Sequence, residues 1–276
     1  MPEMPEVETV RRTLNPLMRG KVIKKVTVWY PKLITGDVDE FKKALQGKKI
    51  LRVDRYGKYL LVRLSGDLTL VSHLRMEGKY HVTSPDAIKN KHEHLEFLFS
   101  DGTAIRYQDV RKFGRMQLVM TGTEHQTTGI KNLGPEPNTP EFTVAYFGEQ
   151  LSRKKKNIKN ALLDQSIVAG LGNIYVDEVL WRSQIHPLSK SNQIPDIKVK
   201  NLHDNINKVI ALAIEKRGTT VHTFLDADGK VGEFQKLLQV YGRAGKECNT
   251  CGTKLEKIKV NGRGTTFCPH CQVEYK

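Results

Sequence analysis

The stretch CNTCGTKLEKIKVNGRGTTFCPHC, residues 248–271, determines the architecture of the C-terminal end of the chain. It holds all four cysteines, as two CxxC pairs whose spacing is typical of a zinc ion bound by two knuckles on paired hairpins. The alternative, a pair of disulfide bonds, is disfavoured because a chain of intracellular character rarely keeps disulfides. Four sulfur ligands leave no open coordination position, so one structural zinc ion is expected. Its ligands are Cys248, Cys251, Cys268 and Cys271.

Upstream of this ribbon, the apolar periodicity is that of helices. Helices are expected at residues 140–151, 157–165, 173–184 and 196–216. The segment AGLGNIYVDE, residues 169–178, places two glycines before Asn173, a strong N-cap whose following N–H groups can bind phosphate. A purely structural helical turn is an equally good interpretation of this segment. Residues 218–234 are expected to form a mobile loop, followed by a strand at 237–241.

The N-terminal half is expected to be rich in β-strands. Short segments between residues 21 and 120 alternate apolar and polar side chains, and SDGT at 100–103 is a good hairpin turn. Repeated strands with few helices between them indicate an antiparallel sandwich or barrel, with one helix near residues 39–45. KNLGPEP at 131–137 then marks a linker to the helical half.

The chain begins MPEMPEVETV, which carries the signals of a helix start. Pro2 suits the first helical position, and acidic residues suit the first turn because of the helix dipole. The expected buried stripe consists of Val7, Val10, Leu14 and Leu17. Glu3 and Glu6 extend this stripe inward, whereas Glu8 and Arg12 form an i,i+4 pair on the solvent side. The simpler alternative is that the first-turn carboxylates are solvated.

The composition favours a polyanion as the partner. The 276 residues include 45 Lys and Arg against 30 Asp and Glu, a formal net charge of +15. Neutralising phosphates releases counterions, so nucleic acid is the expected partner, with a ribosomal environment or an anionic membrane surface as alternatives. Neither a membrane-spanning segment nor a secretory signal is recognisable, so a soluble intracellular protein is expected.

Several residues in the β-rich half are ambiguous when they are considered singly. Met76 and Phe113 follow strands and have arginines beside them, so each is either a wedge for a base stack or an ordinary core residue. Lys58 is either a surface lysine or a catalytic amine. His73 is either a phosphate contact or a satisfied core histidine.

Together these motifs resemble the bacterial formamidopyrimidine-DNA glycosylase family of base excision repair enzymes, over essentially the whole chain. The residues that carry the resemblance are PEMPEVE at 2–8, GKYL at 57–60, SHLRMEG at 72–78, DVRKFG at 109–114, DQ at 164–165, GLGNIYVDE at 170–178, VYGR at 240–243 and the four-cysteine finger. The resemblance implies an α+β multidomain fold: an N-terminal helix plus antiparallel β-sandwich, then a helix-two-turn-helix domain with a four-cysteine zinc finger. The implied divisions are a catalytic β-sandwich domain at 1–130, a hinge linker at 131–139, a helix-two-turn-helix DNA-binding domain at 140–240 with a lesion loop at 218–234, and a zinc finger at 241–276.

The resemblance also implies a bifunctional DNA glycosylase and AP lyase that flips oxidised purines, such as 8-oxoguanine and formamidopyrimidines, out of duplex DNA. After removal of the initiator methionine, the secondary amine of Pro2 attacks the sugar C1′ and forms a Schiff base, and β,δ-elimination cuts both sides of the site. Glu3 assists the opening of the sugar ring and Glu6 orders the site. Lys58 is the second catalytic amine, and Arg263 of the zinc finger joins the catalytic set.

The implied DNA-binding residues are His73, Met76, Arg111, Phe113, Lys159, Asn173, Thr219, Thr220, Tyr241 and Arg263. Met76, Arg111 and Phe113 fill the gap that the flipped nucleotide leaves, with Arg111 facing the orphaned cytosine. Thr219 and Thr220 lie at the start of the lesion loop, and the others hold phosphates. The expected partner is double-stranded DNA that contains a damaged purine or an abasic site. We expect a monomer in the bacterial cytoplasm, associated with the nucleoid through DNA.

Two features depart from the family pattern. Residues 221–223 read VHT where the family often has arginine, so the ranking of lesions stays open. The doubled MPE allows a start at Met4, which would expose Pro5 but lose Glu3. The alternatives in function are an endonuclease VIII-like glycosylase for oxidised pyrimidines and a non-catalytic zinc-finger protein that binds lesions.

Overall fold

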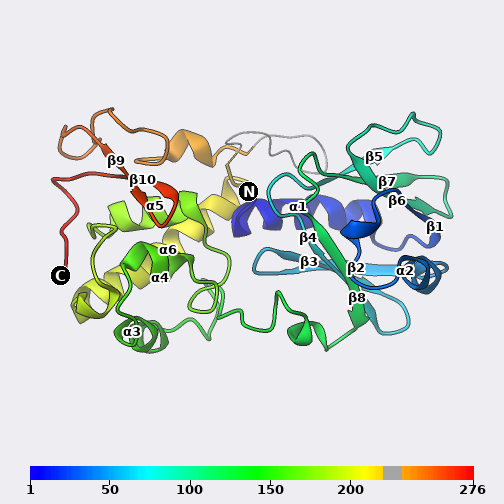
Figure 1. The fold of residues 1–276 in the computed structure, drawn as a ribbon, viewed down its shortest axis with the longest axis horizontal. Helices are drawn as coiled ribbons and strands as arrows, with labels where there is room; N and C mark the ends of the chain where they lie inside the picture. Colours follow the sequence, from blue (N-terminus) through cyan, green and yellow to red (C-terminus); the bar gives the residue numbers. More distant parts are fainter. Residues whose placement is uncertain (220–231) are drawn as a thin grey trace. The chain divides into compact units, whose positions relative to one another are not determined.

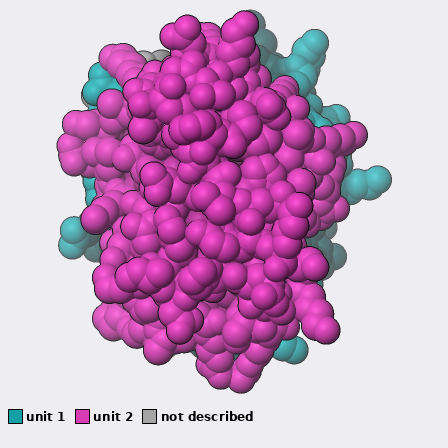
Figure 2. Space-filling view, turned by 90° about the vertical axis from the view of Figure 1, so that its left-hand side faces the viewer, with its two compact units in different colours: residues 1–131, 217–233 teal, residues 132–216, 234–276 magenta. Residues whose placement is uncertain are grey.

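The computed structural model describes residues 1–219 and 232–276, so the predictions for Thr220 and for residues 221–223 lie outside the described residues. The chain forms two compact units, which Figure 2 distinguishes by colour. Unit 1 consists of Met1–Lys131 and Arg217–Glu233, and unit 2 of Asn132–Lys216 and Phe234–Lys276. Unit 1 is therefore completed by a segment that follows most of unit 2 in the sequence.

Unit 1 combines helices with two antiparallel sheets (Figure 1). Its helices are α1 (Met4–Met18) and α2 (Val38–Leu45), with 3-10 turns η1 (Pro31–Leu33) and η2 (Glu124–Gln126). Its strands are β1 (Ile23–Val28), β2 (Ile50–Tyr56), β3 (Tyr59–Leu64), β4 (Leu68–His73), β5 (Lys79–Thr83), β6 (Glu93–Phe99), β7 (Ala104–Gln108) and β8 (Arg115–Met120). The sheet orders are β1-β6-β7-β5 and β2-β3-β4-β8, each with four strands. Strand β5 was not predicted from the sequence.

One apolar core joins both sheets of unit 1 to its first helix. Val10 and Leu14 of α1 belong to the same buried cluster as Val62 of β3 and Phe97 of β6. Helix α1 packs against β2 and β3, so its apolar stripe faces the sheet as its periodicity predicted. The predicted N-terminal helix and antiparallel β-sandwich are therefore confirmed.

The start of α1 differs from the prediction in two respects. The helix begins at Met4 rather than Pro2, with Glu3 as an extended N-cap residue and Pro5 in the first turn. Proline at an early helical position needs no N–H partner, and Pro5 satisfies this rule in place of Pro2. Glu8 is buried rather than solvent-exposed, because Arg55 from β2 reaches it in addition to Arg12.

Unit 2 is mainly helical and ends in a two-stranded hairpin. Its elements are α3 (Val144–Ser152), α4 (Ile158–Leu163), α5 (Asn173–Arg182), η3 (Ser191–Gln193), α6 (Asp196–Glu215), η4 (Phe234–Leu237), β9 (Glu256–Val260) and β10 (Arg263–Phe267). Helix α5 packs against α4, α6 and β10, so it links the helices to the hairpin. The four predicted helices are present with shifted ends. The strand predicted at 237–241 is wrong, because Leu237 ends η4 and the chain then bends. The N–H groups of Gln239, Val240 and Tyr241 bond to the Glu178 carboxylate instead of to a neighbouring strand.

Among the described residues, no helix is both long enough and apolar enough to cross a membrane.

Candidate functional site

The N-terminal segment is buried although it precedes the first helix. Pro2 is buried, and Glu3 and Glu6 are only 3% and 2% exposed. Glu6 Oε2 accepts a hydrogen bond from the backbone N–H of Glu3 at 2.8 Å, as in a capping box. The backbone directly after Pro2 is thus fixed by a carboxylate from the first turn of α1.

The other carboxylate oxygen of Glu6 binds the start of the predicted lesion loop. Glu6 Oε1 accepts hydrogen bonds from the Thr219 N–H at 2.7 Å and from the Thr219 hydroxyl at 3.1 Å. Gly218 has a φ of 74°, and a Cβ there would lie 2.6 Å from Glu6 Oε1. Glycine is therefore needed both for its backbone conformation and for the close approach of the carboxylate. Glu6 joins two segments that are far apart in the sequence.

Lys58 lies in the tight turn between β2 and β3, where Tyr56 pairs with Tyr59. Its side chain is largely removed from water, because the residue is 7% exposed. Its charge also acts on His73, whose pKa it helps to lower. A lysine amine held largely out of water has surroundings that can activate a catalytic amine.

His73 ends β4 as a neutral imidazole. Burial, and then the positive charges of Arg75 and Lys58, lower the pKa of His73 to about 3. Its Nδ1 accepts a hydrogen bond from the Arg75 N–H at 2.9 Å, so the neutral ring carries its proton on Nε2. The Tyr59 ring packs against it edge-on, with 4.4 Å between centroids. His73 can therefore donate one hydrogen bond from Nε2, which suits a phosphate oxygen.

The three predicted wedge residues are all exposed. Met76 follows β4, while Arg111 and Phe113 follow β7. The Phe113 ring is not part of the core, and the Arg111 guanidinium lies 4.8 Å from its centroid. A cation and an aromatic ring displayed together outside the core are suited to stacking against bases.

A buried aspartate holds the loop that carries Arg111. Asp109 accepts hydrogen bonds from the N–H of Arg111 at 3.0 Å and of Gly114 at 2.8 Å. A Cβ at Gly114 would lie 1.8 Å from the Tyr107 hydroxyl oxygen, so the loop closes tightly on β7. This role of Asp109 was not predicted from the sequence, although an aspartate two residues before the loop tip is a known turn signal.

In unit 2, Asn173 is not the N-cap that the sequence analysis expected. Gly172 is the N-cap residue of α5, and Asn173 is its first helical residue. The Asn173 side chain instead donates to the Gly264 carbonyl in β10 at 3.0 Å. The start of α5 is thereby joined to the hairpin that carries Arg263.

Lys159 also differs from its predicted role as a direct phosphate contact. Its side chain is fully buried, with Nζ 2.7 Å from Asp177 Oδ1 and 2.7 Å from Thr265 Oγ1. Asp177 Oδ2 accepts a hydrogen bond from the Thr266 N–H at 3.1 Å, and burial raises the pKa of Asp177 to about 6. This pair holds strand β10 against helices α4 and α5, so in this structure Lys159 supports the hairpin and has no access to solvent.

Tyr241 and Arg263 lie on segments that other residues hold in place. The Glu178 carboxylate accepts hydrogen bonds from the N–H groups of Gln239, Val240 and Tyr241, all within 3.0 Å, and burial raises its pKa. Arg263 is exposed at the start of β10. The role of Glu178 could not be found from the sequence, because its partners lie more than sixty residues downstream.

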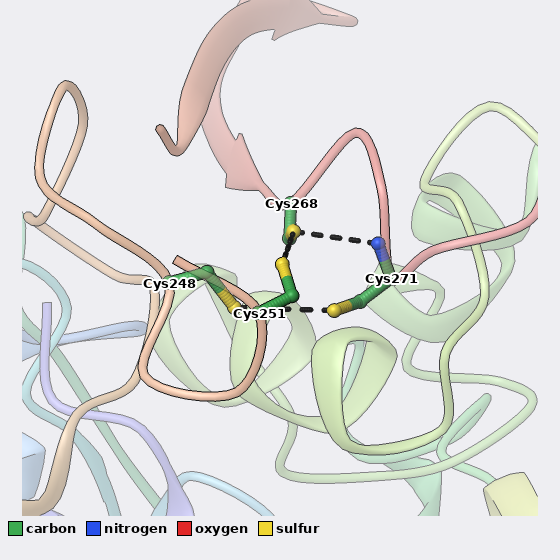
Figure 3. A group of neighbouring side chains, drawn as sticks. All are labelled: Cys248, Cys251, Cys268 and Cys271. Carbon is green, nitrogen blue, oxygen red and sulfur yellow. Dashed lines mark hydrogen bonds between the residues drawn. The ribbon is translucent and has the colours of Figure 1, made fainter. Parts of the chain in front are cut away.

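The four cysteines converge as their spacing predicted (Figure 3). Their sulfur atoms all lie within 4.8 Å of one another, with 4.0 Å between Cys248 and Cys271 and 3.5 Å between Cys251 and Cys268. These distances are too long for disulfide bonds. Tetrahedral coordination with Zn–S bonds of about 2.3 Å requires sulfur atoms about 3.8 Å apart, so the site fits one structural zinc ion.

Three family models match the chain in order. The model of the formamidopyrimidine-DNA glycosylase N-terminal domain matches residues 1–116, and that of the H2TH domain of the same proteins matches residues 133–225. The model described as the zinc finger found in FPG and IleRS matches residues 245–273.

Whole-chain relatives agree with these matches. The formamidopyrimidine-DNA glycosylase of Lactobacillus gasseri is 71% identical over 276 residues and covers 100% of both chains. That of Pediococcus pentosaceus is 53% identical and covers 99% of each chain. Among solved structures, Lactococcus lactis Fpg in complex with abasic-site DNA has a TM-score of 0.93 at 44% identity, covering 98% of this chain and 99% of that one. A mutant of that protein in complex with Fapy-dG DNA has the same TM-score at 45% identity, with the same coverage.

Proposed function

This chain belongs to the formamidopyrimidine-DNA glycosylase family, and from that premise we propose that it works as a base excision repair glycosylase on oxidised purines in duplex DNA. The observation that carries the proposal is the buried N-terminal segment. Pro2 is followed by Glu3 and Glu6, and a hydrogen bond between these two fixes the backbone next to the proline. A buried carboxylate at Glu3, directly after Pro2, is what a general acid for this chemistry requires.

In the proposed reaction, removal of Met1 gives Pro2 a free secondary amine. The nitrogen lone pair attacks the sugar C1′, the bond from C1′ to the base nitrogen breaks, and the base leaves with a proton. Glu3 donates a proton to the ring oxygen as the sugar opens, and an iminium forms between the proline nitrogen and C1′. Glu6 orders this end of the helix.

The iminium acidifies the proton on C2′, so its removal expels the 3′ phosphate. A second elimination then expels the 5′ phosphate, which leaves a one-nucleotide gap. We assign Lys58 to these elimination steps, because its turn holds a buried amine. The neutral His73 donates to a phosphate oxygen from Nε2 and needs no change of protonation at neutral pH, since its pKa is about 3.

Duplex DNA that contains a damaged purine or an abasic site is the proposed partner. Support comes from the solved complexes of the Lactococcus lactis relative with abasic-site and Fapy-dG DNA. Met76, Arg111 and Phe113 are proposed to fill the gap beside the orphaned base, and their exposure supports this role.

Unit 2 is proposed to contact the DNA backbone through Asn173, Tyr241 and Arg263. The zinc ion supplies no chemistry in this scheme; it folds the ribbon that presents Arg263. We further propose a monomer that acts on DNA in the bacterial cytoplasm, with a hinge near residues 131–139 and a separate zinc finger from residue 241.

Borohydride trapping on a duplex with 8-oxoguanine opposite cytosine tests the proposal. We expect a reduced covalent adduct, which peptide mapping by mass spectrometry places on an N-terminal Pro2. Pro2→Gly and Glu3→Gln should lose product formation and keep DNA binding. Unchanged activity in both variants contradicts the mechanism. Binding without an adduct indicates a lesion-binding protein, and an adduct only with oxidised pyrimidines indicates the endonuclease VIII-like alternative.

A further inference from the structure

Glu8 and Arg55 form a buried ion pair that the proposed mechanism leaves unused. Arg55 Nε lies 3.1 Å from Glu8 Oε2, and the side chains are 9% and 11% exposed. Glu8 belongs to α1 and Arg55 to β2, so the pair joins the helix that follows Pro2 to the strand that precedes Lys58. The two ends of this link are therefore both next to proposed catalytic residues.

Arg55 also binds the turn that carries Lys58. Its Nη1 donates to the Gly57 carbonyl oxygen at 2.9 Å. Gly57 has a φ of 56° at the first central position of a two-residue hairpin loop, as in a type II′ turn. The Gly57 carbonyl belongs to the peptide that directly precedes Lys58. A hydrogen bond to this oxygen fixes the plane of that peptide and, with it, the direction in which the Lys58 side chain leaves the backbone.

We propose that Glu8 and Arg55 are positioning residues, which hold the turn that carries Lys58 in a fixed position relative to the N-terminal helix. The proposal rests on the assignment of Pro2 and Lys58 as the two catalytic amines. The contact between Glu8 and Arg55 by itself would only add to the apolar packing of α1 on the sheet. The second contact, from Arg55 to the Gly57 carbonyl, is what distinguishes positioning of Lys58 from plain packing.

The charge state of Glu8 supports a permanent link. Burial works against its ionisation, but hydrogen bonds from Arg11 and Arg12 and the nearby charge of Arg55 lower the pKa of Glu8 to about 2. Glu8 is thus an anion throughout the range in which DNA is a stable duplex. Its two oxygens are shared between Arg11, Arg12 and Arg55, which restricts the carboxylate to one orientation.

A double-mutant cycle on strand cleavage tests the proposal, with the full-length protein and a duplex that carries a preformed abasic site. Arg55→Met removes the hydrogen bonds that the guanidinium gives to Glu8 and to the Gly57 carbonyl, and keeps most of its apolar stem. We expect it to slow single-turnover cleavage by roughly 10- to 100-fold, the scale of a misplaced catalytic group. Because Arg55 acts through Lys58, Arg55→Met combined with Lys58→Ala should be no slower than Lys58→Ala alone. Multiplicative losses in the double variant would overturn the proposal.

Two further variants separate positioning from stability. Arg55→Lys keeps one donor and should recover part of the rate. Arg63→Met is the matched control: it removes the guanidinium of Arg63 in β3, whose Nε lies 3.0 Å from Asp54 Oδ2. This variant should leave the cleavage rate unchanged. Equal slowing in Arg63→Met and Arg55→Met contradicts the proposal. Absence of cleavage by the unmodified enzyme would instead refute the lyase assignment itself, so the two failures are distinguishable.

Discussion

The buried pair of Lys159 and Asp177 offers a quantitative test of how the zinc hairpin is held. Lys159→Met keeps the length of the side chain and removes its charge. The Asp177 carboxylate then loses the Nζ partner 2.7 Å away and keeps the Thr266 N–H at 3.1 Å. The variant therefore leaves the buried Asp177 carboxylate without the ammonium group that pairs with it.

Removing one partner of a buried ion pair costs about 3–5 kcal/mol of unfolding free energy. The cost should depend on pH in a defined direction. The folded-state pKa of Asp177 is already raised from 3.8 to about 6 with Lys159 present, and loss of Lys159 raises it further. A folded pKa above the unfolded one contributes stability at low pH that is lost as the pH rises through the folded pKa. The destabilisation should thus be smaller at pH 6 than at pH 8, by about 1–2 kcal/mol at about 1.4 kcal/mol per pKa unit.

Urea unfolding followed by tryptophan fluorescence measures this cost for unit 2 alone. The chain has two tryptophans, Trp29 in unit 1 and Trp181 in unit 2, so a Trp29→Phe background reports on Trp181. Lys200→Met is the matched control, because its exposed i,i+4 partner Asp204 lies 2.8 Å away and such pairs contribute about 0.3–0.5 kcal/mol. A loss below about 1 kcal/mol for Lys159→Met, or a loss that does not change with pH, would refute the reasoning.

Other predictions follow from single contacts. Burial lowers the pKa of His73 from 6.5 to about 3, so below pH 6.5 the His73 imidazole is protonated in the unfolded chain but not in the folded chain. Between pH 6 and pH 4, the unfolding free energy of the wild type should therefore fall by up to about 1.4 kcal/mol per pH unit relative to that of His73→Gln. Urea unfolding at each pH measures this difference. Gly218→Ala should destabilise unit 1 by about 1 kcal/mol or more, because its φ of 74° is left-handed and its Cβ would meet Glu6; an unchanged unfolding midpoint contradicts this. Elemental analysis should find one zinc per chain. Metal binding supplies the folding free energy of so small a ribbon, so a chelator should unfold the hairpin, seen as a change in circular dichroism and as faster proteolysis. A ribbon that resists proteolysis without zinc contradicts this.

Local patterns in the sequence were sufficient for much of the fold. The stripe through Val10 and Leu14 predicted the buried face of α1, and it is buried in the structure. The cysteine spacing predicted the metal site, because the ligands lie close together along the chain. In both cases the partners are set by short-range geometry, which a single sequence contains.

Long-range partners were not predictable in the same way. Glu8 was expected to face solvent together with Arg12, its i,i+4 partner. It is buried instead, because it also pairs with Arg55, which lies 47 positions away in the sequence. The segment 237–241 was expected to be a strand. The N–H groups of residues 239–241 instead donate hydrogen bonds to the Glu178 carboxylate, so they do not pair with another strand. A local pattern shows which side chains can be buried, and it does not show which distant group will meet them.

Three buried acidic residues have a common physical role. Glu6, Asp109 and Glu178 are each buried, and each accepts backbone N–H groups from a segment that carries a proposed DNA contact. A carboxylate is an effective anchor for a loop because it accepts several hydrogen bonds at once, and amide donors strengthen when the acceptor is ionised. Acidic residues used in this way do not remain on the surface. Among the described residues, nine Asp and Glu are buried but only three Lys and Arg, so the exposed charged side chains there are more strongly basic than the net charge of +15 alone suggests. The same arrangement that fixes the loops therefore favours the approach of a polyanion.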